Sequence, residues 1–110
     1  MTDCLFCKMA HSNASPKIYE DTQLFVIRDI HPKAEVHLLV IPKLHIPSLA
    51  EVQEEHAPLL GYVASSLKNF AKEQGLSSFR TVINTGAQSG QSIFHLHFHL
   101  IGGAHLSAFG

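Results

Sequence analysis

The stretch from Ile93 to Gly103 alternates histidine with apolar residues and reads IFHLHFHLIGG. In a β-strand, successive side chains point to opposite faces, so His95, His97 and His99 would share one face. A helix would spread these imidazoles around its circumference, and the alternation with Phe and Ile favours a strand. Ile101 would join the histidine face, and the core-packing face would hold Phe94, Leu96, Phe98 and Leu100.

Three imidazoles on one strand face suit a metal site or nucleophilic attack on phosphorus, whereas the functionally neutral alternative is a solvated polar face. The preceding segment, residues 84–92, reads NTGAQSGQS and combines two glycines with small hydroxyl and amide residues. The backbone N–H groups of such a loop can face an anion. An anion-binding loop that leads into a histidine-lined strand favours phosphate chemistry.

The run His95–Ile101 resembles the signature of the histidine triad (HIT) family, in which three histidines alternate with apolar residues. The glycine pair after the run, Gly102 and Gly103, is similar to the Hint branch, whereas the Fhit branch usually has proline there. The resemblance covers residues 4–103 and also includes Asp29, the run HLLVIPK from His37 to Lys43, and His45.

The resemblance implies a two-step nucleotidyl transfer in which His97 attacks the α-phosphorus through Nε2. The attack requires the His97 proton to sit on Nδ1, where a backbone carbonyl normally holds it. A covalent histidine–nucleotide intermediate would form, and water would then cleave it. By the same resemblance, His99 and His37 donate to the phosphate oxygens and Ser92 bonds the leaving group, with no catalytic metal required.

Nucleotide contacts are implied by the same resemblance. Asp29 would bond the ribose hydroxyls, since a carboxylate can accept two hydrogen bonds from a cis-diol, although a solvated Asp at a strand end is the neutral alternative. Asn84 would help to hold the sugar. Ile27 and Ile30 would flank the base, and the loop amides would come from Gly90, Gln91 and Ser92.

The leading functional hypothesis is therefore hydrolysis of purine nucleoside 5′-phosphoramidates. A dinucleoside polyphosphate hydrolase is the second enzymatic hypothesis, and the glycine pair and the small size argue against it. A nucleotide-binding regulatory protein and a zinc-binding structural module remain as non-enzymatic alternatives. We also expect a homodimer, because an apolar helix stripe and a sheet edge would otherwise stay partly exposed. In the family, two subunits form one sheet of ten strands.

The only two cysteines, Cys4 and Cys7, have C-x-x-C spacing. A thioredoxin-like redox pair is disfavoured because no strand precedes them. Two buried free thiols and half of a Zn²⁺ site both stay open, and the zinc site needs two further ligands. By resemblance to zinc-containing HIT proteins, His45 and His95 would complete a structural zinc site.

The composition predicts a single domain over residues 1–110, with 45% hydrophobic residues and a net charge of −1. This charge favours neither a nucleic-acid-coating surface nor a membrane-seeking one. No secretory signal or membrane span is evident, and we expect a cytoplasmic protein. Four histidines have no motif support and are expected at the surface, namely His11, His31, His56 and His105.

The element pattern predicts an α+β fold with about five strands in a mostly antiparallel sheet, one long helix and a short N-terminal helix. The long helix would begin between Glu54 and Pro58, show an apolar stripe at helical spacing, and end near Gly75. The short helix would span residues 5–11. Strands are expected at residues 17–20, 24–30, 36–42 and 80–84, followed by the histidine strand.

Overall fold

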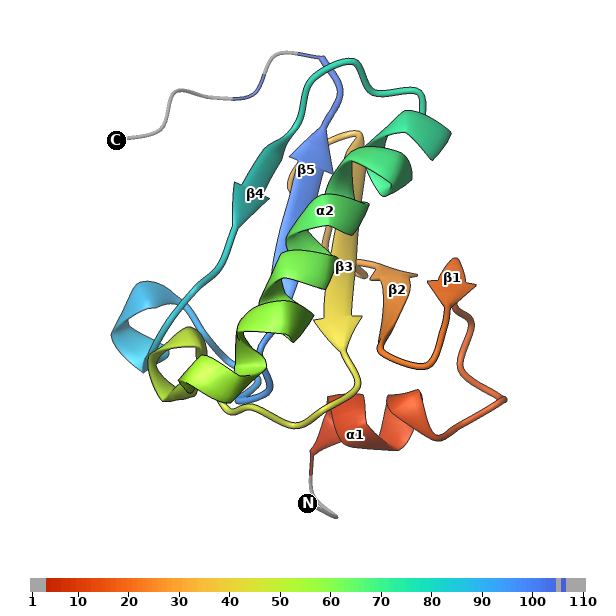
Figure 1. Cartoon of the computed structure of the whole chain (residues 1–110). Coiled ribbons are helices and arrows are strands. Elements are labelled where there is room, and N and C mark those ends of the chain that lie inside the picture. The colour runs from red at the N-terminus through yellow and green to blue at the C-terminus, as the bar shows by residue number, and fades with distance from the viewer. Residues whose placement is uncertain (1–3, 105, 107–110) are drawn as a thin grey trace.

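The computed structural model describes residues 4–104 and 106, and it shows one antiparallel sheet with the strand order β1-β2-β3-β5-β4 (Figure 1). The predicted α+β class, with five strands, one long helix and a short N-terminal helix, is confirmed. Three 3-10 turns were not predicted, at Leu49–Glu51, Glu54–His56 and Ala87–Ser89. The helices and strands are α1 (Leu5–Ala10), β1 (Tyr19–Glu20), β2 (Leu24–Arg28), β3 (Val36–Pro42), α2 (Ala57–Glu73), β4 (Arg80–Val82) and β5 (Phe98–Gly102).

The two-residue period of the strands divides the core between the two faces of the sheet. Alternate apolar residues of β2, β3 and β5 pack under α2, which crosses one face in Figure 1. The other face packs against α1 through the side chains of Phe6 and Ala10. Because both faces of β2 are covered, that strand reads as a continuous apolar run.

Helix α2 buries one stripe of its surface on the sheet, made of Val63, Leu67, Phe70 and Ala71. The helix ends at Glu73, and two residues later Gly75, with a positive φ of 78°, allows the backbone to reverse. The N–H of Gly75 donates to the carbonyl of Lys72 and that of Leu76 to the carbonyl of Ala71, which is a Schellman ending. No helix in residues 4–104 has both the length and the apolar character needed to cross a bilayer.

The histidine strand is shorter than predicted, because residues 93–97 lie outside β5. The ladder with β3 stops at Val40↔Phe98, and the next residues of β3 lead to Pro42, which has no N–H to donate. The N–H of Leu96 donates instead to Ile46 at 2.7 Å. The alternation of faces nevertheless persists through this segment, with Leu96 in the core under α2.

Phe94 is a further correction, because its side chain is 49% exposed and does not join the apolar face expected for it. It precedes the point where the segment meets the sheet, so the pleat of β5 does not fix its direction. The apolar face of the segment therefore consists of Leu96, Phe98 and Leu100.

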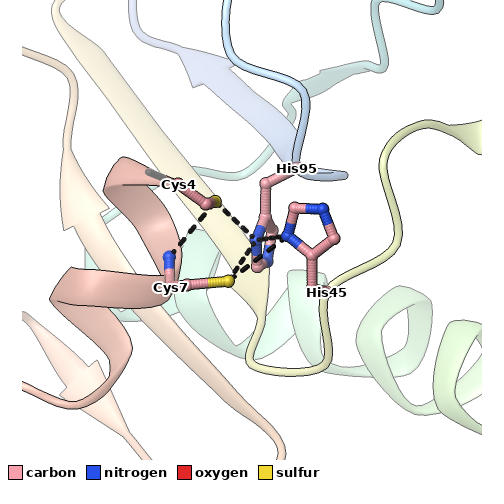
Figure 2. A group of neighbouring side chains, drawn as sticks. All are labelled: Cys4, Cys7, His45 and His95. Atoms are coloured by element: carbon pink, nitrogen blue, oxygen red, sulfur yellow. Dashed lines mark hydrogen bonds between the residues drawn. The ribbon is translucent and has the colours of Figure 1, made fainter. Parts of the chain in front are cut away.

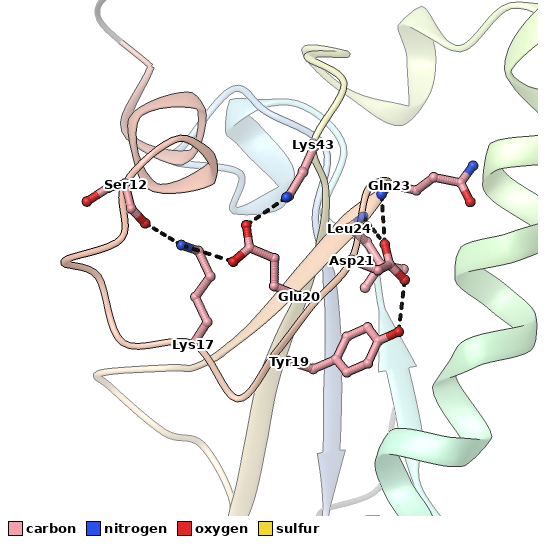
Figure 3. A network of polar contacts seen from close by, with 8 residues as sticks. All are labelled: Ser12, Lys17, Tyr19, Glu20, Asp21, Gln23, Leu24 and Lys43. Atoms are coloured by element: carbon pink, nitrogen blue, oxygen red, sulfur yellow. Dashed lines mark hydrogen bonds and ion pairs between the residues drawn. The ribbon is translucent and has the colours of Figure 1, made fainter.

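A polar network secures the chain between α1 and β2 (Figure 3). The Lys17 ammonium donates to the carbonyl of Ser12 at 2.5 Å and lies 3.7 Å from Glu20. Glu20 also pairs at 2.6 Å with Lys43, which lies just beyond the end of β3. The network therefore joins the segment after α1 to the segment that carries His45.

Candidate functional site

A pocket of about 700 Å³ opens on the face of the sheet opposite α2. It brings together the imidazoles of His37, His97 and His99 and a set of apolar side chains. Leu5, Phe6 and Met9 of α1 form one wall. Among the predicted site residues, those that line the pocket are Ile27, Asp29, Ile30, His37, Asn84, Gly90, Ser92, His97 and His99.

The hydrogen bonds of His97 define which of its nitrogens is reactive. Nδ1 lies 2.7 Å from the carbonyl oxygen of His95, and a carbonyl only accepts, so Nδ1 carries the proton. In the neutral ring, Nε2 then keeps its lone pair. His97 lines the pocket, and this tautomer is the one that the predicted attack through Nε2 would require.

A second chain of hydrogen bonds fixes the tautomers of His37 and His99. The backbone N–H of Lys33 donates to Nδ1 of His37 at 3.0 Å, so the neutral His37 ring carries its proton on Nε2. That Nε2 lies 2.9 Å from Nδ1 of His99, which must accept. His99 therefore carries its own proton on Nε2.

The Nε2–H group of His99 is buried and has no hydrogen-bond partner among the described residues. A buried unpaired donor costs about 1–3 kcal/mol, and such groups are expected at functional sites. The rings of His97 and His99 have centroids 5.2 Å apart. An unpaired N–H donor on a ring next to His97 suits an anion such as a phosphate.

The charge state of the His37 and His99 rings follows from their burial. Burial, then the nearby rings of His97 and His37, lowers the pKa of His99 to about 4. Burial also lowers the pKa of His37, against the attraction of Asp29. Both rings are therefore neutral donors at pH 7, which agrees with the hydrogen-bond chain.

Asp29 lies at the pocket rim, immediately after β2. Its Oδ1 accepts the backbone N–H of His31 at 2.7 Å, and its Oδ2 lies 3.3 Å from Nε2 of His37. The side chains of Asp29, His37 and His99 have the spacing of a metal site. A metal does not suit them, because Nδ1 of His37 accepts from Lys33, which leaves Nε2 protonated and unable to ligate.

The glycine-containing loop is held by Gln91, for which the sequence predicted a nucleotide contact. The Gln91 side chain is 4% exposed, and its Oε1 accepts from Gly86 at 2.9 Å. Its Nε2 donates to the carbonyls of Pro47 and Ile93. The backbone N–H groups of Gly90 and Gln91 are also bonded inside the loop, which leaves Ser92 as the predicted amide without a partner among the described residues.

Four predicted metal-ligating side chains converge, with all their ligand atoms within 4.8 Å of one another (Figure 2). The Sγ atoms of Cys4 and Cys7 lie 3.3 and 3.6 Å from Nδ1 of His95. Cys7 Sγ lies 3.3 Å from Nδ1 of His45, and the two Nδ1 atoms are 3.2 Å apart. A tetrahedral zinc site has S···N edges of about 3.5 Å and N···N edges of about 3.3 Å.

The surroundings of this cluster also fit a cation. The second nitrogen of His95, Nε2, donates to the carbonyl of Pro42 at 2.7 Å, which leaves Nδ1 free to ligate. Burial, followed by the neighbouring Cys4 sulfur, raises the pKa of the Cys7 thiol. Two half-buried thiolates this close together need a compensating positive charge, which a divalent metal would supply.

Sequence reasoning missed the pocket wall supplied by α1, namely Leu5, Phe6 and Met9. The available signal was the pair of apolar residues, Leu5 and Phe6, that separates Cys4 from Cys7. His31, expected as a surface residue, also lines the pocket rim, while His11 is exposed as expected and His56 is half-buried. His105 lies outside the described residues.

The low pKa of His99 predicts a specific dependence of stability on pH. Below about pH 6.5 the unfolded chain binds a proton that native His99 takes up only near pH 4. The free energy of unfolding should therefore fall as the pH drops from about 6.5 to about 4, by at most about 1.4 kcal/mol per pH unit for this group. When urea titrations at each pH give the free energy of unfolding, a plot of this free energy against pH should have a shallower slope for His99→Gln than for the wild type. His11→Gln, which removes an exposed histidine, is the control; equal slopes for wild type and His99→Gln would contradict the assignment.

Similarity to known proteins agrees with this geometry. The family model described as scavenger mRNA decapping enzyme C-term binding matches residues 3–110. Protein HitA of Neisseria gonorrhoeae is 45% identical over 104 residues, which cover 93% of this chain and 97% of that protein. The 14 kDa zinc-binding protein of Zea mays is 41% identical over 96 residues, covering 84% and 75% of the two chains.

Solved structures extend the likeness to the whole fold. A histidine triad protein from Clostridium difficile superimposes with a TM-score of 0.93 and 34% identity, covering 100% of this chain and 98% of that one. A HIT family hydrolase from Legionella pneumophila gives 0.90 and 38%, covering 96% of both chains. A Zn-bound histidine triad family protein from Mycobacterium smegmatis gives 0.74 and 32%, covering 91% and 74%. With this similarity along nearly its entire length, the chain belongs to the histidine triad family.

Proposed function

We propose that this protein hydrolyses purine nucleoside 5′-phosphoramidates to the nucleoside monophosphate and an amine. The observation that carries the proposal is the pair of fixed tautomers: a lone pair on Nε2 of His97 beside an unpaired Nε2–H on His99. A nucleophile next to a preorganised donor suits attack on a phosphorus whose oxygens gain negative charge. Similarity to a protein described as a HIT family hydrolase supports the reaction class.

In the first step, Nε2 of His97 forms a bond to the α-phosphorus and the bond from phosphorus to the amine breaks. His99 donates to a phosphate oxygen, and Ser92, which lines the same pocket, bonds the leaving nitrogen while that nitrogen takes a proton from solvent water and departs as the amine. In the second step, water attacks the phosphorus, the bond to His97 breaks, and the attacking water returns one proton to the solvent. The imidazole is then neutral again and the nucleoside monophosphate is released.

Nucleotide binding would use the remaining lining residues of the pocket. Ile27 and Ile30 offer apolar surface for a base, and Ile30 is 85% exposed without a ligand. Asp29 keeps lone pairs beyond its contact with His31 for the ribose hydroxyls. The Asn84 side chain lies against Gly90 in the glycine loop and would help to hold the sugar.

His97→Ala should abolish turnover of adenosine 5′-phosphoramidate, by at least about a thousandfold, because it removes the group that forms the covalent intermediate. His99→Ala and His37→Ala should slow turnover about 10²–10³-fold, since they remove stabilisation and keep the nucleophile. The measurement is intact mass after rapid quench, in which the wild type should carry one adenylyl group and His97→Ala none. Turnover by His97→Ala at the wild-type rate would refute the mechanism.

A second candidate, hydrolysis of a dinucleoside polyphosphate, is favoured by one observation: the matching family model is described after an mRNA decapping enzyme. Both reactions would use the same attack by His97. The ratio of kcat/KM for adenosine 5′-phosphoramidate to that for a diadenosine polyphosphate separates them in a single preparation. A ratio below one would favour the second candidate, and binding of AMP without any turnover would favour a regulatory role.

The cluster of Cys4, Cys7, His45 and His95 would hold one structural Zn²⁺. The fit of its distances to a tetrahedron supports this assignment, and so does similarity to the maize protein described as zinc-binding and to the Zn-bound mycobacterial structure. The ion would tie α1 to the segment that leads into β5 and would take no part in the chemical step. A reducing compartment such as the cytoplasm would keep both thiols available.

Protein purified without chelators should contain about one zinc per chain by elemental analysis. Cys4→Ser and His45→Gln should each lose the metal and lower Tm, because binding of a structural metal contributes to folding free energy. His11→Gln, which removes an exposed histidine outside the cluster, should keep both zinc and Tm. A zinc-to-chain ratio near zero in fully active wild-type protein would rule out the site.

A homodimer would complete the sheet. β4 is an edge strand that pairs only with β5 among the described residues, and the adjacent Phe79 is 41% exposed. Edge strands of this kind pair readily with a second copy, and two-fold symmetry is the commonest arrangement. Two sheets joined at β4 would form the ten-stranded sheet of the family.

Light scattering at micromolar concentration should give the mass of two chains. Phe79→Asp should shift the protein towards the monomer, because it places a charge beside the pairing edge. Leu49→Asp, at a residue that is 40% exposed in a 3-10 turn, should leave the mass unchanged. A wild-type monomer under these conditions would contradict the proposal.

A further inference from the structure

We infer that Phe6 is a positioning residue for His97 and that α1 couples the occupancy of the Cys4/Cys7/His45/His95 cluster to nucleotide binding. The inference rests on the proposed function and adds a regulatory link between its two sites. The juxtaposition that carries it is a single helix, Leu5–Ala10, which contacts both the metal cluster and the pocket.

Helix α1 is short, and few contacts within the helix itself hold its ends. Cys4 is its N-cap and accepts the N–H of Cys7 through its sulfur at 3.4 Å. Six residues are too few to be stable as an isolated helix, so tertiary contacts must fix its position. Its apolar contacts are Phe6 and Ala10 in the core, and its polar contacts are the two cysteines of the cluster.

Phe6 lies between the two thiols in sequence and between two histidines in space. Its ring is 2% exposed and meets the His97 ring edge-on, with centroids 5.2 Å apart and planes at 78°. It meets the His95 ring in the same manner, at 5.9 Å and 85°. These edge contacts leave the direction of the His97 ring dependent on the position of Phe6.

The same helix forms a wall of the pocket through Leu5, Phe6 and Met9. A metal that holds Cys4 and Cys7 against His45 and His95 would therefore fix this wall together with the nucleophile. Without the metal, α1 would lose the two bonds through Cys4 and Cys7 that tie it to His45 and His95, and a ligand would have to order the wall at the expense of its own affinity. By thermodynamic linkage, the nucleotide must then strengthen metal binding by the same factor.

The test measures this linkage directly in full-length protein. Isothermal titration with AMP gives the dissociation constant of the zinc-loaded and of the chelator-treated wild type. We expect AMP to bind at least about fivefold more weakly without zinc, and zinc to bind more tightly by the same factor at saturating AMP. AMP affinity that does not depend on zinc, in protein that circular dichroism shows to be folded, would overturn the inference.

Phe6→Leu tests the positioning role while all four metal ligands remain. In the zinc-loaded variant, kcat should fall about tenfold or more, because the imidazole loses its aromatic neighbour and its alignment. Phe70→Leu is the matched control, since Phe70 is 6% exposed and packs in the core on the opposite face of the sheet. It should lower Tm by a similar amount and leave kcat unchanged.

The split between kcat and KM separates positioning from simple wall contact. A Phe6→Leu variant with raised KM and wild-type kcat would make Phe6 a pocket wall only and would overturn the positioning role. If the zinc-free wild type fails to fold, the rate at which a chelator removes zinc from the folded wild type tests the coupling: AMP should slow this removal, and an unchanged rate would overturn the coupling. The zinc-loaded Phe6→Leu variant then tests the positioning role by the same split between kcat and KM. If the zinc-loaded wild type neither binds AMP nor turns over the substrate, the proposed function is refuted as well. If turnover is normal and depends on neither zinc nor Phe6, only this inference is refuted.

Discussion

The antiparallel register between β3 and β5 is the constraint on which the rest of the structure depends. It sets Leu39 opposite His99 and His37 opposite Ile101, so the two imidazoles become diagonal neighbours on one face. The same register places the intervening apolar residues under α2. A shift by one residue would turn the imidazoles into the core and the apolar side chains into the pocket.

Backbone groups, more than side-chain pairs, assign the roles of the imidazoles. A carbonyl holds the proton of His97, another holds that of His95, and one N–H fixes His37. Because main-chain groups cannot change their donor or acceptor character with pH, each ring keeps one tautomer. The chemical differences among these similar residues therefore arise from where the strands and their connections place each ring.

Much of this arrangement was predictable from the sequence, because it depends on periodicity. Alternation predicted the imidazole face and the core residues Leu96, Phe98 and Leu100, and the family resemblance indicated which residues would meet Cys4 and Cys7. The features that were missed depend on long-range pairing. Pro42, which belongs to β3, limits the length of β5. The Gln91 side chain stays in its loop because it donates to carbonyls 2 and 44 residues away. Phe6 reaches His97 only after the sheet has formed, and no local pattern encodes that contact.

The strand order also determines when the protein can complete its fold during synthesis. β5 is the last of the described strands, yet it lies between β3 and β4 and joins them. Until it has been made, β4 has no partner in this sheet and the edge of β3 that β5 will cover is open. Strands β1, β2 and β3 can pair in chain order, but the sheet cannot be completed in that order. Its central pairing depends on contacts between residues far apart in sequence, which slows folding. Unpaired edges exposed during that interval are the points at which a chaperone would be expected to bind.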